Sequence, residues 1–364
     1  MKNKIVVCHV IHSFDFGGIQ KLLYDLVSSQ RMNNLITVNI LVIKKNGEFL
    51  SRFQSLDVDI LSLGVKKIYF FGFNNIIKTI KVFKKSDIVH FHNFNPFISI
   101  IPFIYKKSVI YTEHGNFAFG RKKSMVDYIL IKMRIMYFKF FPIQIIANSN
   151  FTKSYLKKTW NVYDKKITTI HNGVKLIGNI SQKNVNFIRK QYKNRFIIGT
   201  TSRLAGFKRI DRLIKSFKLI NRNNNNVVLL IIGDGIEKLS LQKLVENENI
   251  NNVHFLGYKE NVYDYQSAFD VCVFPSNNEP FGLVAVESYF LNKPTLVFKD
   301  GGGIKEIVSM VNKNDIVQSE EDLAERIQYY IDNDIKSINN TNVLNYFSAK
   351  RMEQDYFRCY TKYL

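Results

Sequence analysis

Cysteine, proline and long apolar runs are all scarce in this chain. Its 364 residues include three cysteines and six prolines. Cys8, Cys272 and Cys359 lie far apart without metal-ligand spacing, which excludes a disulfide scaffold and is typical of a reducing compartment. No uninterrupted apolar stretch approaches the roughly 18 residues of a membrane-spanning helix. Residues 1–14 predict a first strand and not a secretory leader, so we expect a cytoplasmic protein.

Acidic residues are scarce in the first half of the chain. The formal net charge is +22, and residues 1–180 hold 27 Lys and Arg against 9 Asp and Glu, a net of +18. The remaining residues carry 25 basic against 21 acidic side chains, a net of only +4. A field of this kind attracts an anionic membrane, a lipid diphosphate or nucleic acid.

Short apolar runs alternate with helical patterns throughout, which predicts βαβ units and parallel sheets. The expected strands are Ile5–Ile11, Leu35–Ile43, Asp87–Phe91, Ser108–Thr112, Ile143–Ala147, Ile167–Ile170, Phe196–Thr200, Val227–Ile232, Val253–Leu256, Asp270–Phe274 and Thr295–Phe298. We interpret the polar stretch Lys175–Asn194 as a linker. The length fits two domains, which we place at 1–178 and 179–344. The aromatic residues of 345–364 recur at helical spacing.

Glycines follow several of the expected strands. Gly17 and Gly18 follow the first strand, Gly233 opens a Gly-Asp-Gly turn, and 301–303 form a run of three. Glycine permits positive φ and lets a backbone approach phosphate closely. No complete GxGxxG and no GxxxxGK[ST] motif is present, so neither an NAD-binding protein nor a P-loop nucleotidase is supported.

Basic side chains and histidines also follow strands. Arg203 and Lys208 are two cations that can hold a diphosphate, the first in a bidentate manner and the second as a point charge. His114 ends a strand and is expected to point into the ligand crevice of the sheet, although a structural role is the alternative. His90 and His92 share one face of a strand; a metal pair is one interpretation, but no third ligand is visible and packing is favoured.

The segment 274–287, FPSNNEPFGLVAVE, is the most informative part of the chain. It predicts a buried strand, a tight loop containing Glu279, and a helix containing Glu287. Two helical carboxylates at this spacing would lie ~12 Å apart along the axis, which argues against the paired carboxylates of a glycosidase. Amides near a helix N-terminus attract phosphate or sugar oxygens, and here they belong to Phe281, Gly282 and Leu283.

Taken together, these motifs resemble the retaining glycosyltransferases of family 4. The resemblance covers essentially the whole chain and implies an α/β protein with two Rossmann-like doubly wound domains facing across a cleft, the GT-B fold. The first domain would bind the acceptor and the second a nucleotide sugar, and the helix within 345–364 would cross back onto the first domain. A nucleoside diphosphate sugar of UDP or GDP type is then the donor, and no cofactor or metal is expected.

The resemblance also implies roles for individual residues. Glu287 would bind the ribose and Glu279 the sugar ring. Arg203 and Lys208 would neutralise the leaving diphosphate, while His114 would contact the donor sugar near the reacting centre. The full set expected to bind the donor is Gly17, Gly18, Arg203, Lys208, Gly233, Glu279, Phe281, Gly282, Leu283 and Glu287. Arg209 and Arg212 are predicted to be helix-surface charges.

The expected function is sugar transfer to a glycan or polyprenyl-diphosphate-linked acceptor in bacterial surface-polysaccharide assembly, at the inner face of an anionic membrane and without nucleic acid. Arg121–Phe141 interleaves basic and apolar residues, so it is either a lipid-facing helix or a core helix with a basic rim. A nucleotide-sugar 2-epimerase of the same architecture and a non-enzymatic membrane or nucleic-acid binder remain alternatives. The triplets Asp57-Val-Asp59, at a short strand, and Asp332-Asn-Asp334, at a helix end, are not expected to bind metal.

Overall fold

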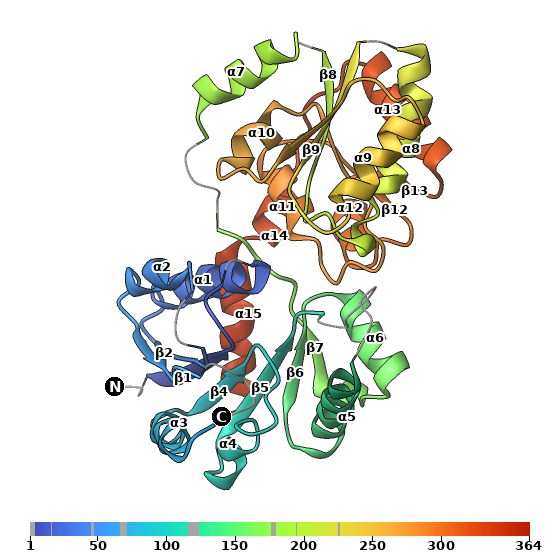
Figure 1. The fold of residues 1–364 in the computed structure, drawn as a ribbon. Helices are drawn as coiled ribbons and strands as arrows, with labels where there is room; N and C mark the ends of the chain where they lie inside the picture. The colour runs from blue at the N-terminus through green and yellow to red at the C-terminus, as the bar shows by residue number, and fades with distance from the viewer. Residues whose placement is uncertain are drawn as a thin grey trace. The chain divides into compact units, whose positions relative to one another are not determined.

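The computed structural model describes residues 4–15, 17–44, 47–65, 71–115, 124–175, 180–193, 195–224 and 226–364. The chain divides into two compact units (Figure 1). The first unit comprises 1–175 and 347–364, and the second comprises 176–346. The sequence analysis ended the first domain at residue 178 and the second at residue 344, whereas the structure places these boundaries after residues 175 and 346. Each unit is described by itself.

The first unit is built on a seven-stranded parallel sheet in the order β3-β2-β1-β4-β5-β6-β7. Its strands are β1 Ile5–Ile11, β2 Ile36–Val42, β3 Asp59–Ser62, β4 Ile88–Phe91, β5 Ser108–Glu113, β6 Gln144–Ala147 and β7 Ile167–Thr169. The order reverses between β1 and β4, which is the doubly wound Rossmann arrangement. In such sheets ligands bind beyond the carboxyl ends of the strands at this reversal.

Helices cover both faces of this sheet because alternate side chains of each strand point to opposite sides. The helices are α1 Gly18–Gln30, α2 Leu50–Gln54, α3 Phe73–Lys85, α4 Ile101–Ile104, α5 Met125–Phe140, α6 Asn150–Trp160 and α15 Ala349–Lys362, with a 3₁₀ turn at Asp164–Lys166. Cys8 and Val10 face a core with α3, α5 and α6, whereas Val7 and Ile11 face α1 and α15. Figure 1 shows the C-terminal α15, in red, beside α1, in blue.

The second unit repeats the same topology with six parallel strands in the order β10-β9-β8-β11-β12-β13. The strands are β8 Phe196–Thr201, β9 Val227–Ile232, β10 Val253–Gly257, β11 Val271–Phe274, β12 Thr295–Phe298 and β13 Ile316–Val317. The helices are α7 Gln182–Gln191, α8 Ile210–Asn223, α9 Lys238–Asn247, α10 Val262–Ala268, α11 Leu283–Phe290, α12 Ile304–Ser309, α13 Glu320–Asp332 and α14 Thr341–Tyr346, with 3₁₀ turns at Gly206–Lys208 and Lys313–Asp315. The order reverses between β8 and β11.

The linker prediction is wrong over most of its length, because α7 is an ordered helix of the second unit. Ser181 caps it by accepting a hydrogen bond from the Asn184 amide. Arg189 forms an ion pair with the buried Asp270, with 2.6 Å between Nη1 and Oδ2. Val185 and Ile188 are buried one helical turn apart, and the surrounding Asn and Lys residues concealed this short apolar stripe.

All three cysteines are free and buried. None of the helices in the described ranges combines the length and apolar character needed to cross a membrane.

Candidate functional site

The loops that leave the carboxyl ends of β8, β9, β11 and β12 carry most of the predicted site of the second unit. Arg203 follows β8, Gly233 follows β9 and Glu279 follows β11, while the three glycines 301–303 follow β12. Since β8 and β11 flank the reversal of strand order, these loops surround the position where a Rossmann-like sheet binds its ligand. Segments far apart in sequence are thus brought to one edge of one sheet.

The backbone of Glu279 is fixed by the glycine turn after β12. Its amide donates to the Gly301 carbonyl at 2.9 Å, and the Gly303 amide donates to the Glu279 carbonyl at 2.7 Å. Gly302 has φ +75°, and a Cβ there would lie 2.6 Å from the Glu279 carbonyl oxygen. The turn therefore requires glycine to let this backbone pass, and Glu279 lies in a loop as the sequence predicted.

The side chain of Glu279 forms an ion pair with Lys208. The distance between Lys208 Nζ and Glu279 Oε2 is 2.5 Å, and the two side chains are 13% and 14% exposed. Lys208 ends the 3₁₀ turn after β8, and its ammonium lies 5.1 Å from the centre of the Phe207 ring. The residue predicted to hold the leaving diphosphate and the residue predicted to hold the sugar are direct neighbours.

The Gly-Asp-Gly turn holds the backbone on either side of Arg203. Its neighbour Leu204 donates to the Asp234 carbonyl at 2.9 Å, and a Cβ at Gly233 would lie 1.9 Å from the Ser202 carbonyl oxygen. Close packing of two loops thus explains why Gly233 is glycine, while its predicted contact with the donor stays a prediction. The Arg203 side chain is exposed and has no hydrogen bond or ion pair within the described part of the chain.

Glu287 lies on α11, one turn beyond the start of that helix. Gly282 directly precedes α11 with φ +97° and ψ +57°, and a Cβ there would lie 2.4 Å from Ile304 Cγ1. No described side chain caps α11. Glu287 is largely buried and its Oε1 accepts a hydrogen bond from the Tyr263 hydroxyl at 2.9 Å. Tyr263 was not identified from the sequence, because it lies on α10, outside the motif.

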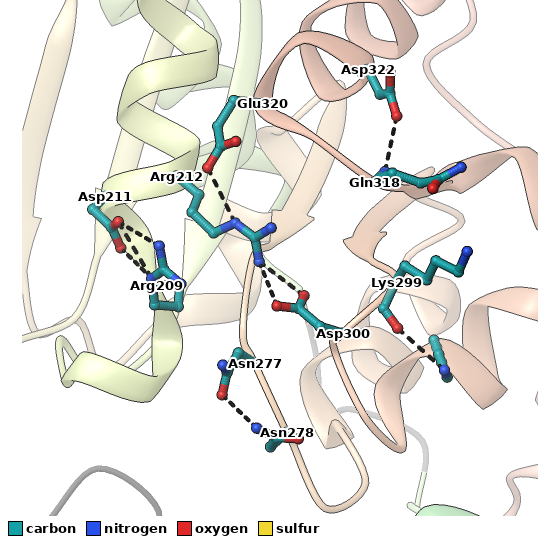
Figure 2. A network of polar contacts seen from close by, with 11 residues as sticks. Arg209, Asp211, Arg212, Asn277, Asn278, Lys299, Asp300, Gln318, Glu320 and Asp322 are labelled. Atoms are coloured by element: carbon teal, nitrogen blue, oxygen red, sulfur yellow. Dashed lines mark hydrogen bonds and ion pairs between the residues drawn. The ribbon is translucent and has the colours of Figure 1, made fainter.

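The prediction that Arg212 is a surface charge is wrong. Figure 2 shows its guanidinium between Asp300 and Glu320, with 2.9 Å to Asp300 Oδ1 and 3.2 Å to Glu320 Oε1. It also lies 3.7 Å from the centre of the Phe298 ring. The neighbouring Asp300 carbonyl accepts from the Asn278 amide, so Arg212 anchors the segment beside Glu279. Arg209, in contrast, pairs with Asp211 and is partly exposed.

The remaining site residues belong to the first unit. His114 directly follows β5, and its Nε2 lies 3.1 Å from His92 Nδ1. The preceding Glu113 is buried and pairs with Arg134 of α5 at 3.3 Å, and it also accepts from the Gly115 amide. Arg134 stacks on Trp160. Because Arg134 is buried, it is not part of the basic rim that the sequence suggested for this helix.

Gly17 and Gly18 lie at the start of α1, as predicted, but neither adopts the left-handed backbone conformation that favours glycine. Gly17 has φ 178°, which is extended backbone. Gln20 closes this loop by donating to the Ser13 carbonyl at 3.0 Å. Gly47 is the glycine that the loop requires, because a Cβ there would lie 2.1 Å from the Phe14 carbonyl carbon, and the sequence analysis missed it.

Two family models match the chain, one over each unit. Residues 16–176 match the model described as Glycosyltransferase Family 4, and residues 181–345 match Glycosyl transferases group 1. The chain belongs to this glycosyltransferase family. The resemblance inferred from the motifs is therefore confirmed at the level of the family.

Curated relatives of this glycosyltransferase include an uncharacterized glycosyltransferase, MJ1059, of Methanocaldococcus jannaschii. It is 28% identical over 250 residues, which is 64% of this chain and 60% of the relative, so the match spans less than two-thirds of that protein. The capsular polysaccharide biosynthesis glycosyltransferase CapM of Staphylococcus aureus is 26% identical, with 85% of this chain and 89% of CapM covered.

Solved structures share the fold of this glycosyltransferase. The Anabaena HepE structure in complex with UDP and glucose matches with a TM-score of 0.79 at 19% identity, covering 98% of this chain and all of HepE. A glycosyltransferase of Rickettsia africae matches with a TM-score of 0.76 at 19% identity, covering 99% of this chain and 98% of that one. The prediction of two Rossmann-like domains of GT-B type is thereby confirmed.

Proposed function

We propose that this glycosyltransferase transfers a sugar from a nucleoside diphosphate sugar to a glycan or lipid-linked acceptor during assembly of a bacterial surface polysaccharide, with retention of anomeric configuration. The observation that carries the proposal is the convergence of Arg203, Lys208, Glu279 and Glu287 on one edge of the second sheet. The relatives support the acceptor class, since CapM is named for capsular polysaccharide and WclY of Escherichia coli for O-antigen biosynthesis.

The donor is proposed to be a UDP sugar, since HepE, with the same fold, is seen with UDP and glucose. GDP is the alternative base. Arg203 offers an exposed guanidinium suited to bidentate contact with a phosphate. Lys208 adds a second positive charge held in place by Glu279. Charges fixed before the reaction stabilise the departing diphosphate without reorganisation in the transition state, so the proposed reaction uses no metal and no cofactor.

The two carboxylates have separate proposed roles. Glu279 would accept hydrogen bonds from sugar hydroxyls while it remains paired with Lys208, so one ion pair would contact both sides of the bond that breaks. Glu287 would accept from ribose hydroxyls, and Tyr263 holds its other side. A carboxylate fixed by a hydrogen bond offers its remaining lone pairs in a defined direction. His114 of the first unit would accept from the donor sugar.

The acceptor side is proposed to include an anionic membrane surface at α5. Its apolar residues include an exposed set formed by Met125, Val126, Tyr128, Ile129, Met133, Met136 and Phe140. Lys132 is exposed among them. Apolar side chains beside lysines suit the boundary between lipid headgroups and acyl chains, and the net charge of +18 in residues 1–180 has the matching sign. Lys122 and Lys123 lie outside the described residues.

A ligand panel tests the donor. Thermal unfolding is measured with UDP, GDP, ADP and their sugars, since a ligand at about 100 Kd stabilises by ~2.7 kcal/mol. UDP sugars should raise the melting temperature, and Arg203→Ala should diminish this rise. Arg222→Ala, an exposed change at the far end of α8, is the matched control. Stabilisation by none of these nucleotides would argue against the proposed donor site.

Turnover distinguishes a transferase from the epimerase. Radiolabelled UDP sugar should pass to a membrane-lipid extract, and NMR of the product should show the donor's anomeric configuration. Interconversion of nucleotide sugars without any acceptor would show an epimerase, and an inverted product would overturn retention alone.

A further inference from the structure

Four histidines meet in the interior of the first unit. His9 lies on β1, His90 on β4, His92 directly after β4 and His114 directly after β5. β1 and β4 pair with His9 opposite His90. Alternate residues share a face of a sheet, so these side chains gather on the face covered by α1 and α15. His9 and His90 have no exposed surface and His92 is 3% exposed, whereas His114 is half-buried.

Three of these rings form a continuous hydrogen-bonded chain from α1 to His114. His9 Nε2 lies 2.9 Å from Gln30 Oε1. His9 Nδ1 lies 2.9 Å from His92 Nε2, and His92 Nδ1 lies 3.1 Å from His114 Nε2. The other nitrogen of His114, Nδ1, has no hydrogen-bond partner among the described residues. The chain thus begins at a buried amide and ends at a proposed site residue.

The proton of each ring follows from its neighbours. Burial lowers the pKa of His9 to about 4 and holds the pKa of His92 well below its usual value, so both rings are neutral at physiological pH and carry one proton each. The Gln30 amide nitrogen donates to the Tyr360 hydroxyl oxygen at 3.2 Å, so its oxygen faces His9 and accepts from Nε2–H. A neutral imidazole has one donor and one acceptor. His9 Nδ1 therefore accepts from His92 Nε2–H, and His92 Nδ1 accepts from His114 Nε2–H.

Side chains of the C-terminal helix α15 fix the donor-to-acceptor order of these hydrogen bonds. The Tyr360 oxygen that accepts from Gln30 lies 2.8 Å from His90 Nδ1. His90 Nε2 lies 2.7 Å from Thr112 Oγ1, which in turn lies 2.9 Å from the Tyr356 hydroxyl. Because Tyr356 and Tyr360 belong to α15, the last helix of the chain holds the amide that sets the proton order.

A metal site is the competing interpretation of this cluster. The candidate ligand atoms of His9, His90 and His92 all lie within 4.8 Å of one another, so the structure supplies the third histidine that the sequence did not reveal. Every ring nitrogen of these three residues has a hydrogen-bond partner in the described protein. A metal ion would have to displace several of these partners, so we favour the hydrogen-bonded chain.

We propose that Gln30, His9 and His92 are positioning residues that hold His114 with its proton on Nε2, so that its bare Nδ1 accepts a hydrogen bond from a hydroxyl of the bound sugar. The proposal rests on the proposed function, because it takes His114 as a contact of the donor. It also explains why Gln30, His9 and His92 are buried in a position where apolar residues would pack at lower cost. The opposite tautomer would present a donor in place of an acceptor.

Two substitutions of His92 separate positioning from packing. His92→Phe removes the acceptor for His114, whereas His92→Asn keeps an oxygen near the position of Nδ1. The first should lower turnover about 10–100-fold, by analogy with the loss found when the partner that orients a metal-ligating histidine is removed, with little change in donor KM. The second should recover most of the rate. Equal loss in both variants would indicate a packing role and overturn the proposal.

The tautomer is measured directly by 15N NMR of imidazole nitrogens in histidine-labelled protein. Wild-type His114 should show a protonated Nε2 and a bare Nδ1, and His92→Phe should lose this preference. A wild-type His114 protonated at Nδ1 would overturn the proposal, as would one equivalent of tightly bound metal in the purified protein. If His92→Phe does not fold, Gln30→Glu, which is nearly isosteric and accepts from His9, should keep the tautomer.

These measurements also separate this proposal from the proposed function. The tautomer is read without any substrate, so a protein with the expected Nε2–H but without sugar transfer would contradict the function and leave the chain of hydrogen bonds in place.

Discussion

The ammonium nitrogen of Lys208 lies 2.5 Å from a carboxylate oxygen of Glu279, and the ion pair joins the loop after β8 to the loop after β11. Both side chains are mostly buried. Removal of one charge leaves the other largely buried without a partner. This destabilises a protein more than the replacement of both residues by apolar ones. The pair is therefore both a part of the proposed donor site and a clamp between two of its loops.

Substitution of the two glutamates should separate nucleotide binding from turnover. Glu287→Ala should weaken binding of UDP sugar and of free UDP by ~1.5–3 kcal/mol, the value of a hydrogen bond to a charged group. Glu279→Ala should mainly lower turnover and discrimination between sugars. Calorimetry with free UDP checks this, and equal loss of UDP affinity in both variants would contradict the division of roles.

Removal of Lys208 or Arg203 should lower turnover strongly. Each is proposed to stabilise the leaving diphosphate, and loss of one preorganised stabiliser typically costs roughly 10²–10³ in rate. Lys208→Ala also leaves Glu279 unpaired, so Lys208→Ala with Glu279→Gln should lose less than the two single effects combined. Initial rates with EDTA should equal those without it. Strict dependence on a divalent ion would refute the metal-free assignment.

Gly282→Ala should destabilise the second unit and impair donor binding. The φ of +97° is unfavourable for alanine, and a Cβ would lie 2.4 Å from Ile304 Cγ1, so either α11 or Ile304 must shift. Such strain costs on the order of 1–3 kcal/mol, which thermal unfolding and UDP titration would detect. Gly72→Ala is the control, because nothing lies within 4 Å of a Cβ there and its φ of −72° is ordinary. Equal melting temperatures for both variants would contradict the strain.

Stability should fall as the pH is lowered from about 6.5 towards 4. Burial lowers the pKa of His9 and His12 to about 4 in the folded protein, while the unfolded chain takes up protons near 6.5. In this window the unfolded state binds more protons, so each such group should cost ~1.4 kcal/mol per pH unit. Urea unfolding at pH 7.5 and 5.0 measures the change. His9→Gln should show a shallower pH dependence, and an unchanged slope would argue that His9 is not a neutral buried ring.

Membrane binding should depend on α5. Met133→Ser with Phe140→Ser and, separately, Lys132→Gln with Lys139→Gln should each reduce co-sedimentation with anionic vesicles. The lysine variant should show a weaker salt dependence, because each basic residue near the surface contributes ~1 kcal/mol within a Debye length of ~8 Å. UDP affinity should not change. Lys218→Gln in the second unit is the control. If both double variants bound anionic vesicles as strongly as the wild type does, α5 would not be the membrane contact.

The sequence by itself determined the two doubly wound sheets and the order of their motifs. Each strand is a short apolar run ended by glycine or a polar residue, and this pattern is local, so Val227–Ile232 and Thr295–Phe298 were predicted at their exact bounds. The loop position of Glu279 also followed from local features, namely a proline and a glycine between a strand and a helix. By contrast, β13 has two residues, too few for a pattern, and α7 was concealed by its polar composition.

Only the tertiary structure decided which side chains meet. The pairs Lys208–Glu279, Tyr263–Glu287 and Arg212–Asp300 join residues far apart in sequence, because parallel strands bring distant loops to one edge of a sheet. His9 became the neighbour of His90 and His92 for the same reason, since β1 and β4 are adjacent in the sheet but separated in the chain by β2 and β3. Sequence periodicity shows which face a residue occupies, whereas strand order shows what lies beside it.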